Sequence, residues 1–209
     1  MSLSTWLAFF AASWAISFSP GPGAVSAMAS GLKYGFRRGY WTTAGLILGI
    51  LAQFLIVAVG LGAVLAASET AFNLLKWLGA AYLVYLGWLQ FRTDAAPVAV
   101  EAGPSADFRI RDLVLRGCLI NLTNPKGTVF LMAVVPQFLN TAEPLAMQYL
   151  IIAGTLCLTD LVAMGCYTTL ASRMLKLLRK PGHVRWVNRS FGAMFILAGT
   201  VLATFSKRV

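Results

Sequence analysis

Six long apolar stretches, separated by short polar gaps, constrain this chain more than any other feature of its sequence. They cover residues 3–31, 40–66, 72–91, 113–139, 145–171 and 190–206. A helix needs about 20 apolar residues to cross a hydrocarbon core about 30 Å thick, and a helix satisfies its own backbone hydrogen bonds there. Each stretch is too long for a strand, so we predict an all-α integral membrane protein with six transmembrane helices.

The composition favours a membrane environment. Of the 209 residues, 58% are hydrophobic and 11% are charged, whereas a soluble domain carries roughly 25% charged residues. The net charge of +10 is compatible with a nucleic-acid partner, but the basic residues lie in short gaps, where they orient helices and contact anionic lipids. We therefore expect membrane lipids and no nucleic acid among the partners of a single membrane domain, residues 1–209.

The basic residues are distributed unevenly between the two sides of the predicted bundle. The gaps after the first, third and fifth stretches hold 13 of the 17, namely Lys33, Arg37, Arg38, Arg92, Arg109, Arg111, Arg116, Arg173, Lys176, Arg179, Lys180, Arg185 and Arg189. By the positive-inside rule, these gaps are cytoplasmic. We predict a multi-pass protein of the inner (cell) membrane with both termini on the periplasmic or extracellular side.

The chain divides near its midpoint into two similar halves. A flexible linker at 93–112 separates a three-helix repeat at 1–92 from a second one at 113–209. Proline-containing segments interrupt the first stretch of each half, and residues 76–83 resemble residues 189–196. Because each half has three spans, the halves insert with opposite orientations. We predict a 3+3 inverted-topology repeat with broken helices one and four, an architecture in which secondary transporters bind substrate at the repeat interface.

The proline segments are expected to break their helices and to expose backbone groups. Proline lacks an N–H and displaces the carbonyl four residues earlier. On this rule Pro20, Pro22 and Pro125 free the carbonyls of residues 16, 18 and 121. Ser19 and Asn124 each precede a proline and are favoured N-cap residues, so each is predicted to cap a second half-helix.

A half-helix that begins inside the membrane is suited to bind an anionic group such as an α-carboxylate. It presents unpaired N–H groups and the positive end of the helix dipole. Gly21 and Gly23 would let a ligand approach the backbone closely. The alternative is that both segments are ordinary proline kinks, but two breaks at corresponding places favour a binding site.

Two ionisable residues lie within the predicted spans, where an unpaired charge costs several kcal/mol. Lys126 adjoins the second break, and Asp160 lies midway along the fifth stretch. Asp160 can hold a substrate ammonium, carry a coupling proton, or form a structural ion pair with Lys126. Lys126 can instead extend to the cytoplasmic interface.

Further polar residues complete the candidate site. Gln53 either faces the same cavity or makes a buried interhelical hydrogen bond, whereas the spacing of Gly45 and Gly49 is typical of helix packing. The candidate substrate-binding residues are Ser19, Pro20, Gly21, Pro22, Gly23, Gln53, Asn121, Asn124, Pro125, Lys126 and Asp160. No catalytic, phosphate-binding or metal-binding motif occurs, so we expect neither an enzyme nor a cofactor.

The two proline segments resemble the signature segments of the LysE/RhtB family of bacterial amino-acid exporters. The likeness covers Ser19-Pro20-Gly21-Pro22-Gly23 and Asn121-Leu122-Thr123-Asn124-Pro125-Lys126, followed by Pro136-Gln137-Phe138. It runs the length of the chain and favours the RhtB-type branch, whose members export homoserine, homoserine lactone and threonine. It implies efflux of such a small amino acid or derivative by proton antiport, with protons coupled through Asp160. Exporters of leucine-like or basic amino acids, a channel and a membrane-embedded enzyme are the alternatives, and a homodimer is left open.

Overall fold

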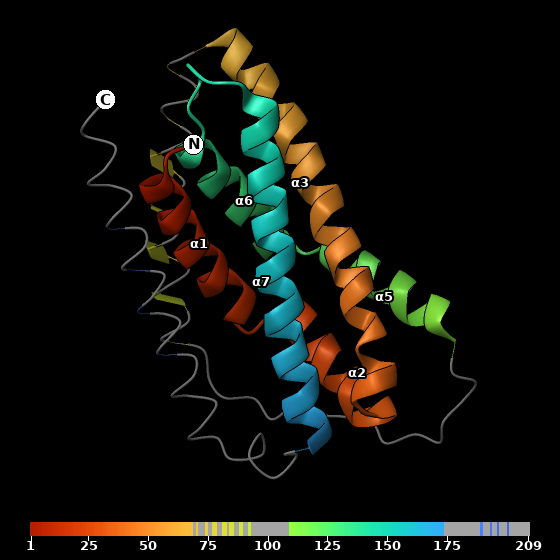
Figure 1. The fold of residues 1–209 in the computed structure, drawn as a ribbon. Helices are drawn as coiled ribbons and strands as arrows, with labels where there is room; N and C mark the ends of the chain where they lie inside the picture. Colours follow the sequence, from red (N-terminus) through yellow and green to blue (C-terminus); the bar gives the residue numbers. More distant parts are fainter. Residues whose placement is uncertain are drawn as a thin grey trace.

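The described part of the protein is a bundle of α-helices (Figure 1). The computed structural model describes residues 1–68 and 109–173, with isolated further positions between residues 70 and 92 and between residues 189 and 200. Its helices are α1 (Leu3–Phe18), α2 (Pro22–Gly39), α3 (Trp41–Ala67), α5 (Ile110–Leu122), α6 (Pro125–Phe138) and α7 (Leu145–Arg173). Within these residues every regular element is helical, as the apolar stretches predict.

Helices α3 and α7 are the long antiparallel members of the bundle (Figure 1). Large apolar side chains on their outer faces are exposed: Val59 of α3 is 68% exposed and Leu150 of α7 is 67% exposed. Hydrocarbon accommodates such faces, whereas water does not. By length and composition, α3 over Trp41–Leu61 and α7 over Leu145–Arg173 can each cross a membrane, and the bent pair α5–α6 is a third candidate among the described residues. The arrangement is that of a membrane protein.

Both predicted helix breaks are present. The first apolar stretch is divided between α1 and α2, and the fourth is divided between α5 and α6, which meet at an angle of 56°. Helix α2 continues to Gly39, beyond the predicted end of the first stretch at residue 31, although Gly35 interrupts it with a φ of 72°. Glycine adopts this left-handed backbone conformation without steric cost.

The capping residues of the two breaks differ from one another. Asn124 caps α6 as predicted, since its side chain accepts a hydrogen bond from the Lys126 N–H. The prediction for Ser19 was wrong: it is the C-cap of α1, and Gly21 precedes α2 in an extended conformation. The physical reason is the second proline. Pro22 disfavours helical geometry at the residue before it, so the helix begins only at Pro22 itself.

Glycines allow α3 and α5 to pack backbone against backbone. A methyl group added to Gly45 would lie 2.0 Å from the Val114 carbonyl oxygen, and one added to Gly117 would lie 2.5 Å from the Thr42 carbonyl oxygen. Gly49 is equally close to α5. The interpretation of Gly45 and Gly49 as packing residues is therefore confirmed, and the contact holds the second break against the middle of α3.

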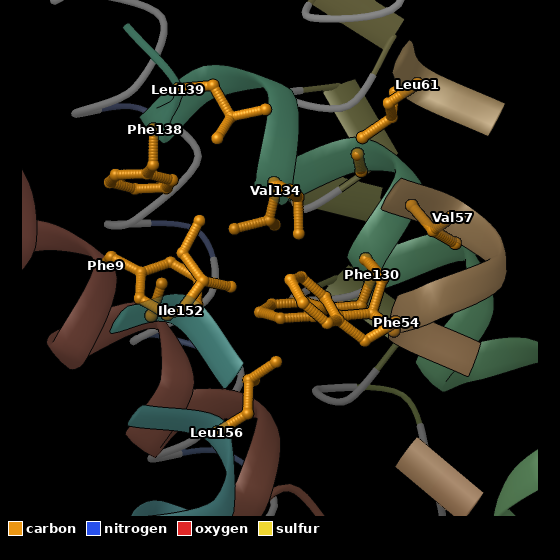
Figure 2. Packing of buried hydrophobic residues seen from close by; sticks show 14 of the residues in the cluster. Phe9, Phe54, Val57, Leu61, Phe130, Val134, Phe138, Leu139, Ile152 and Leu156 are labelled. Carbon is orange, nitrogen blue, oxygen red and sulfur yellow. The ribbon is translucent and has the colours of Figure 1, made fainter. Parts of the chain in front are cut away.

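Two apolar clusters fill the bundle. The larger joins α1, α3, α6 and α7 around Phe9, Phe130 and Ile152 (Figure 2), where the Phe9 and Phe138 rings meet edge to face at 5.2 Å. The second joins α2, α3 and α7 around Ala27, Leu46 and Met164. We call these the first and second apolar clusters, and the site described below lies between them.

Several sequence predictions fall outside the described residues. Apart from isolated described positions, they are the third and sixth stretches (72–91 and 190–206), almost all of the linker (93–112), and the resemblance between 76–83 and 189–196. The six-helix count and the two-repeat division therefore stay predictions.

Candidate functional site

The two helix breaks meet at the centre of the bundle. Lys126 is the second residue of α6, and its ammonium reaches across to the segment between α1 and α2. There it donates to the Ser19 carbonyl at 3.3 Å, to the Pro20 carbonyl at 3.2 Å and to the Ser19 hydroxyl. Segments more than 100 residues apart in sequence thus form one structure.

A cavity of about 60 Å³ lies where the breaks meet. Its walls come from both broken helices and from α3 and α7: Ile16, Ser17, Ser19, Gly21, Gly23, Ala24, Leu46, Ile50, Asn121, Asn124, Lys126, Gly127, Phe130, Leu156, Asp160 and Met164. Phe130, Leu156 and Ile50 belong to the first apolar cluster, and Leu46, Ala24 and Met164 belong to the second. Packed apolar side chains therefore border this polar cavity on two sides.

Asp160 faces the cavity from α7. It shares one helix face with Leu156 and Met164, which are four residues away on either side and also line the cavity. Its carboxyl group is hydrogen-bonded to the Ser17 hydroxyl of α1. The Ser17 hydroxyl oxygen also lies 3.1 Å from the Thr159 hydroxyl oxygen. One ammonium and one carboxylate thus line a small cavity deep in an apolar bundle.

The carbonyls that the prolines were expected to free already have hydrogen-bond donors. The Phe18 carbonyl accepts from the Tyr167 hydroxyl at 2.6 Å, and the Ile16 carbonyl accepts from the Ser19 N–H at 3.1 Å. The Asn121 carbonyl accepts from the Asn124 N–H at 3.0 Å. This prediction was wrong because buried carbonyls recruit local or tertiary partners. The oxygens that face Lys126 belong instead to Ser19 and Pro20.

The two half-helix N-termini offer different surroundings to an anion. Helix α2 has no side-chain cap at Gly21, and Gly23 and Ala24 of its first turn line the cavity. Helix α6 is capped by Asn124. The uncapped end of α2 is therefore the better site for an anionic group.

Gln53 of α3 forms hydrogen bonds with the second break. Its amide nitrogen donates to the Leu122 carbonyl at 3.2 Å, to the Asn124 carbonyl at 3.0 Å and to the Thr128 hydroxyl at 2.7 Å. The interhelical hydrogen bonds that the sequence left as an alternative are thus observed. A methyl group on Gly127 would lie 2.7 Å from the Gln53 Oε1 atom, so glycine at 127 makes room for this side chain.

The sequence of the chain was compared with those of known protein families. The family model described as LysE type translocator matches residues 14–206. The chain belongs to this family. The resemblance that the proline segments indicate is therefore confirmed.

The relatives of this LysE-family chain include named exporters. It is 38% identical to a homoserine/homoserine lactone efflux protein of Salmonella typhimurium, over 98% of each chain. It is also 38% identical to an uncharacterized membrane protein of Vibrio cholerae, over 98% of each chain. A leucine efflux protein of an Enterobacter species is 29% identical, over 78% of this chain and 81% of the relative. No solved structure matches significantly.

The cavity contains most of the residues that the sequence singled out. Ser19, Gly21, Gly23, Asn121, Asn124, Lys126 and Asp160 line the cavity, whereas Pro20, Pro22, Gln53 and Pro125 are not among its lining residues. Asn121 also donates to the Leu46 carbonyl at 2.7 Å. Sequence reasoning missed Ser17 and Tyr167. Tyr167 lies seven residues after Asp160, on the same face of α7, so helical periodicity could have found it.

Proposed function

We propose that this protein is a secondary exporter of a small amino acid or derivative in the bacterial inner membrane. Homoserine, homoserine lactone and threonine are the proposed cargoes, and protons are the counter-ions. The observation that carries the proposal is the meeting of two helix breaks around a cavity lined by one ammonium, Lys126, and one carboxylate, Asp160. The efflux names of full-length relatives support the direction and the class of cargo.

The packing of the described helices supports an inverted repeat. Helix α7 contacts both halves of the first broken helix, α1 and α2, and α3 contacts both halves of the second, α5 and α6. In Figure 1 the first broken helix and the second run in opposite directions across the bundle. An inverted repeat generates this reciprocal pattern, and transporters of that kind alternate access by moving one repeat against the other.

Substrate and proton are assigned to separate parts of the cavity. The substrate carboxylate, where one is present, fits the uncapped N-terminus of α2 at Gly23 and Ala24. Asp160 is the proposed proton carrier, since a carboxyl group in an apolar bundle binds and releases a proton readily when its surroundings change. At about 60 Å³ the cavity is smaller than the ~300–1,000 Å³ of ordinary ligand pockets, so substrate enters only when the apolar clusters on either side separate.

Counterflow in proteoliposomes tests this function. Vesicles preloaded with unlabelled homoserine should transiently accumulate labelled homoserine from outside, because a carrier exchanges one for the other. A panel containing homoserine lactone, threonine, leucine and lysine identifies the preferred cargo. Leucine alone would favour the alternative suggested by the leucine-exporting relative. Uptake without stimulation by internal substrate indicates a channel, and chemical conversion of the label indicates an enzyme.

Orientation is tested by cysteine labelling at two exposed positions that lie near opposite ends of the described bundle. Cys118, Cys157 and Cys166 are first replaced by serine. Thr141→Cys should then react with a membrane-impermeant maleimide in intact cells, whereas Arg37→Cys should react only after the membrane is opened, since basic segments stay cytoplasmic. Reaction of both positions from the same side would contradict the proposed topology.

A further inference from the structure

The Lys126 ammonium is bound at the first break as a free ammonium ion would be. A primary ammonium has three N–H donors and no acceptor, and three oxygens face it: the Ser19 and Pro20 carbonyls and the Ser19 hydroxyl. The helical ladder of α2 begins with the bond from the Val25 N–H to the Gly21 carbonyl at 2.9 Å. The Ser19 and Pro20 carbonyls precede Gly21 and lie outside that hydrogen-bond ladder. They can therefore accept hydrogen bonds from a cation.

The chemistry of the proposed cargoes requires such a site. Homoserine and homoserine lactone both carry a primary ammonium, but the lactone has no carboxylate. A carrier that takes both must recognise the group that they share. We propose that Ser19 and Pro20 form the substrate's ammonium site, and that Lys126 fills this site in the empty carrier. The inference rests on the proposed function, because it takes a small primary amine as cargo.

Displacement by substrate leaves Lys126 with one partner of opposite charge in the same cavity. Of the residues that line the cavity, Lys126 and Asp160 are the charged ones. A deprotonated Asp160 attracts the Lys126 ammonium and opens the site to substrate, since charges interact strongly in a medium of low dielectric constant. A protonated Asp160 exerts no such attraction, so Lys126 competes with substrate for the site and weakens substrate binding. Binding of the proton and binding of the substrate then oppose each other, as antiport requires.

Removing the Lys126 side chain should convert the first break into a site for a free alkylammonium ion. Ethylammonium chloride should raise the Tm of purified Lys126→Ala saturably, because a ligand that binds the folded state stabilises it. The wild-type Tm should not change, because the tethered ammonium competes at a high effective concentration. Sodium chloride controls for ionic strength. Lys33→Ala, which removes an exposed lysine of α2, controls for the loss of one positive charge and should not respond.

Competition identifies the group that is recognised. Homoserine and homoserine lactone should displace ethylammonium from Lys126→Ala, whereas N-acetylhomoserine, which lacks the ammonium, should not. The proposal would be overturned if ethylammonium did not raise the Tm of a folded Lys126→Ala protein, or if it raised the Tm of the wild type equally. Because this titration involves no transport, ethylammonium binding combined with failed counterflow would reject the proposed cargo and leave the ammonium site standing.

If Lys126→Ala does not fold, a measurement on the wild type tests whether substrate displaces Lys126 from the ammonium site. Saturating homoserine lactone should raise the rate at which acetic anhydride acetylates Lys126, relative to the exposed Lys33, because the displaced amine loses its three hydrogen bonds. The ratio is read by mass spectrometry of peptides. An unchanged or lowered ratio would show that substrate does not displace Lys126, and would overturn the proposal.

Discussion

Replacing Asp160 with asparagine should abolish most proton-driven efflux while substrate exchange continues. Asparagine keeps the size of the side chain and its ability to bond with the Ser17 hydroxyl, but it carries no transferable proton. Net efflux driven by an imposed pH gradient should fall by about tenfold or more, which corresponds to about 1.4 kcal/mol or more. Counterflow at equal pH moves no net protons and should continue at saturating homoserine. Its half-saturation concentration should rise, because asparagine, like protonated Asp160, leaves Lys126 in competition for the ammonium site. Both rates are measured in the same proteoliposome preparation.

The pattern of loss separates the three roles considered for Asp160. If its carboxylate binds the substrate ammonium directly, Asp160→Asn should damage efflux and exchange alike, even at saturating homoserine. If it is a structural partner of Lys126, the variant should give less folded protein, and adding Lys126→Gln should recover much of the yield. The structure offers separate partners to the two groups, Ser17 for Asp160 and the first break for Lys126. We therefore expect the yield to stay close to that of the wild type.

Asp112 supplies the matched control. It is an exposed carboxylate in the first turn of α5 and does not line the cavity. Asp112→Asn removes the same charge and should leave gradient-driven efflux unchanged within about twofold, as most exposed substitutions do. Normal efflux, normal pH dependence and normal yield in Asp160→Asn would contradict all three roles, and with them the assignment of the cavity as the transport site.

Local chemistry made the helix breaks predictable from the sequence. Proline acts on its own helix turn and on the residue before it, so both breaks and the cap at Asn124 could be inferred without tertiary information. The same reasoning failed at Ser19, where two prolines two residues apart compete to set the helix start. It also failed for the Phe18 carbonyl, whose donor is Tyr167, 149 residues further along the chain.

The arrangement of the site depends on contacts that no local pattern encodes. The cost of an intramembrane charge made Lys126 and Asp160 candidate site residues, but it did not reveal that Lys126 binds the opposite break. That contact joins residues 107 positions apart. For Gln53, a polar side chain in an apolar helix indicated a buried partner, and the sequence left open whether the partner was substrate or protein. The structure distinguishes a substrate partner from a protein partner, because it shows which helices are neighbours.

Adding a single methyl group at Gly45 should strongly destabilise the packing of α3 against α5. In Gly45→Ala the new Cβ would lie 2.0 Å from the Val114 carbonyl oxygen. That oxygen belongs to the backbone of α5 and cannot rotate away as a side chain would. The two helices must separate, and the loss of close contact extends to Gly49 and Gly117. Overpacking of this kind typically lowers the free energy of unfolding by about 1–3 kcal/mol. We expect a value at the upper end of this range, because the clash is with backbone atoms.

Gly60→Ala is the matched control, because it makes the same change in the same helix where a methyl group would meet no atom within 4 Å. The readouts are the monodisperse fraction after detergent extraction and the Tm of that fraction. Gly45→Ala should lose most of the monodisperse fraction or melt several degrees lower, since about 1 kcal/mol shifts Tm by roughly 2–4 °C in a chain of this size. Gly60→Ala should match the wild type. Equal behaviour of the two variants would mean that α3 and α5 are not in close backbone contact. The second break, which α5 carries to the centre of the bundle, would then need a different position.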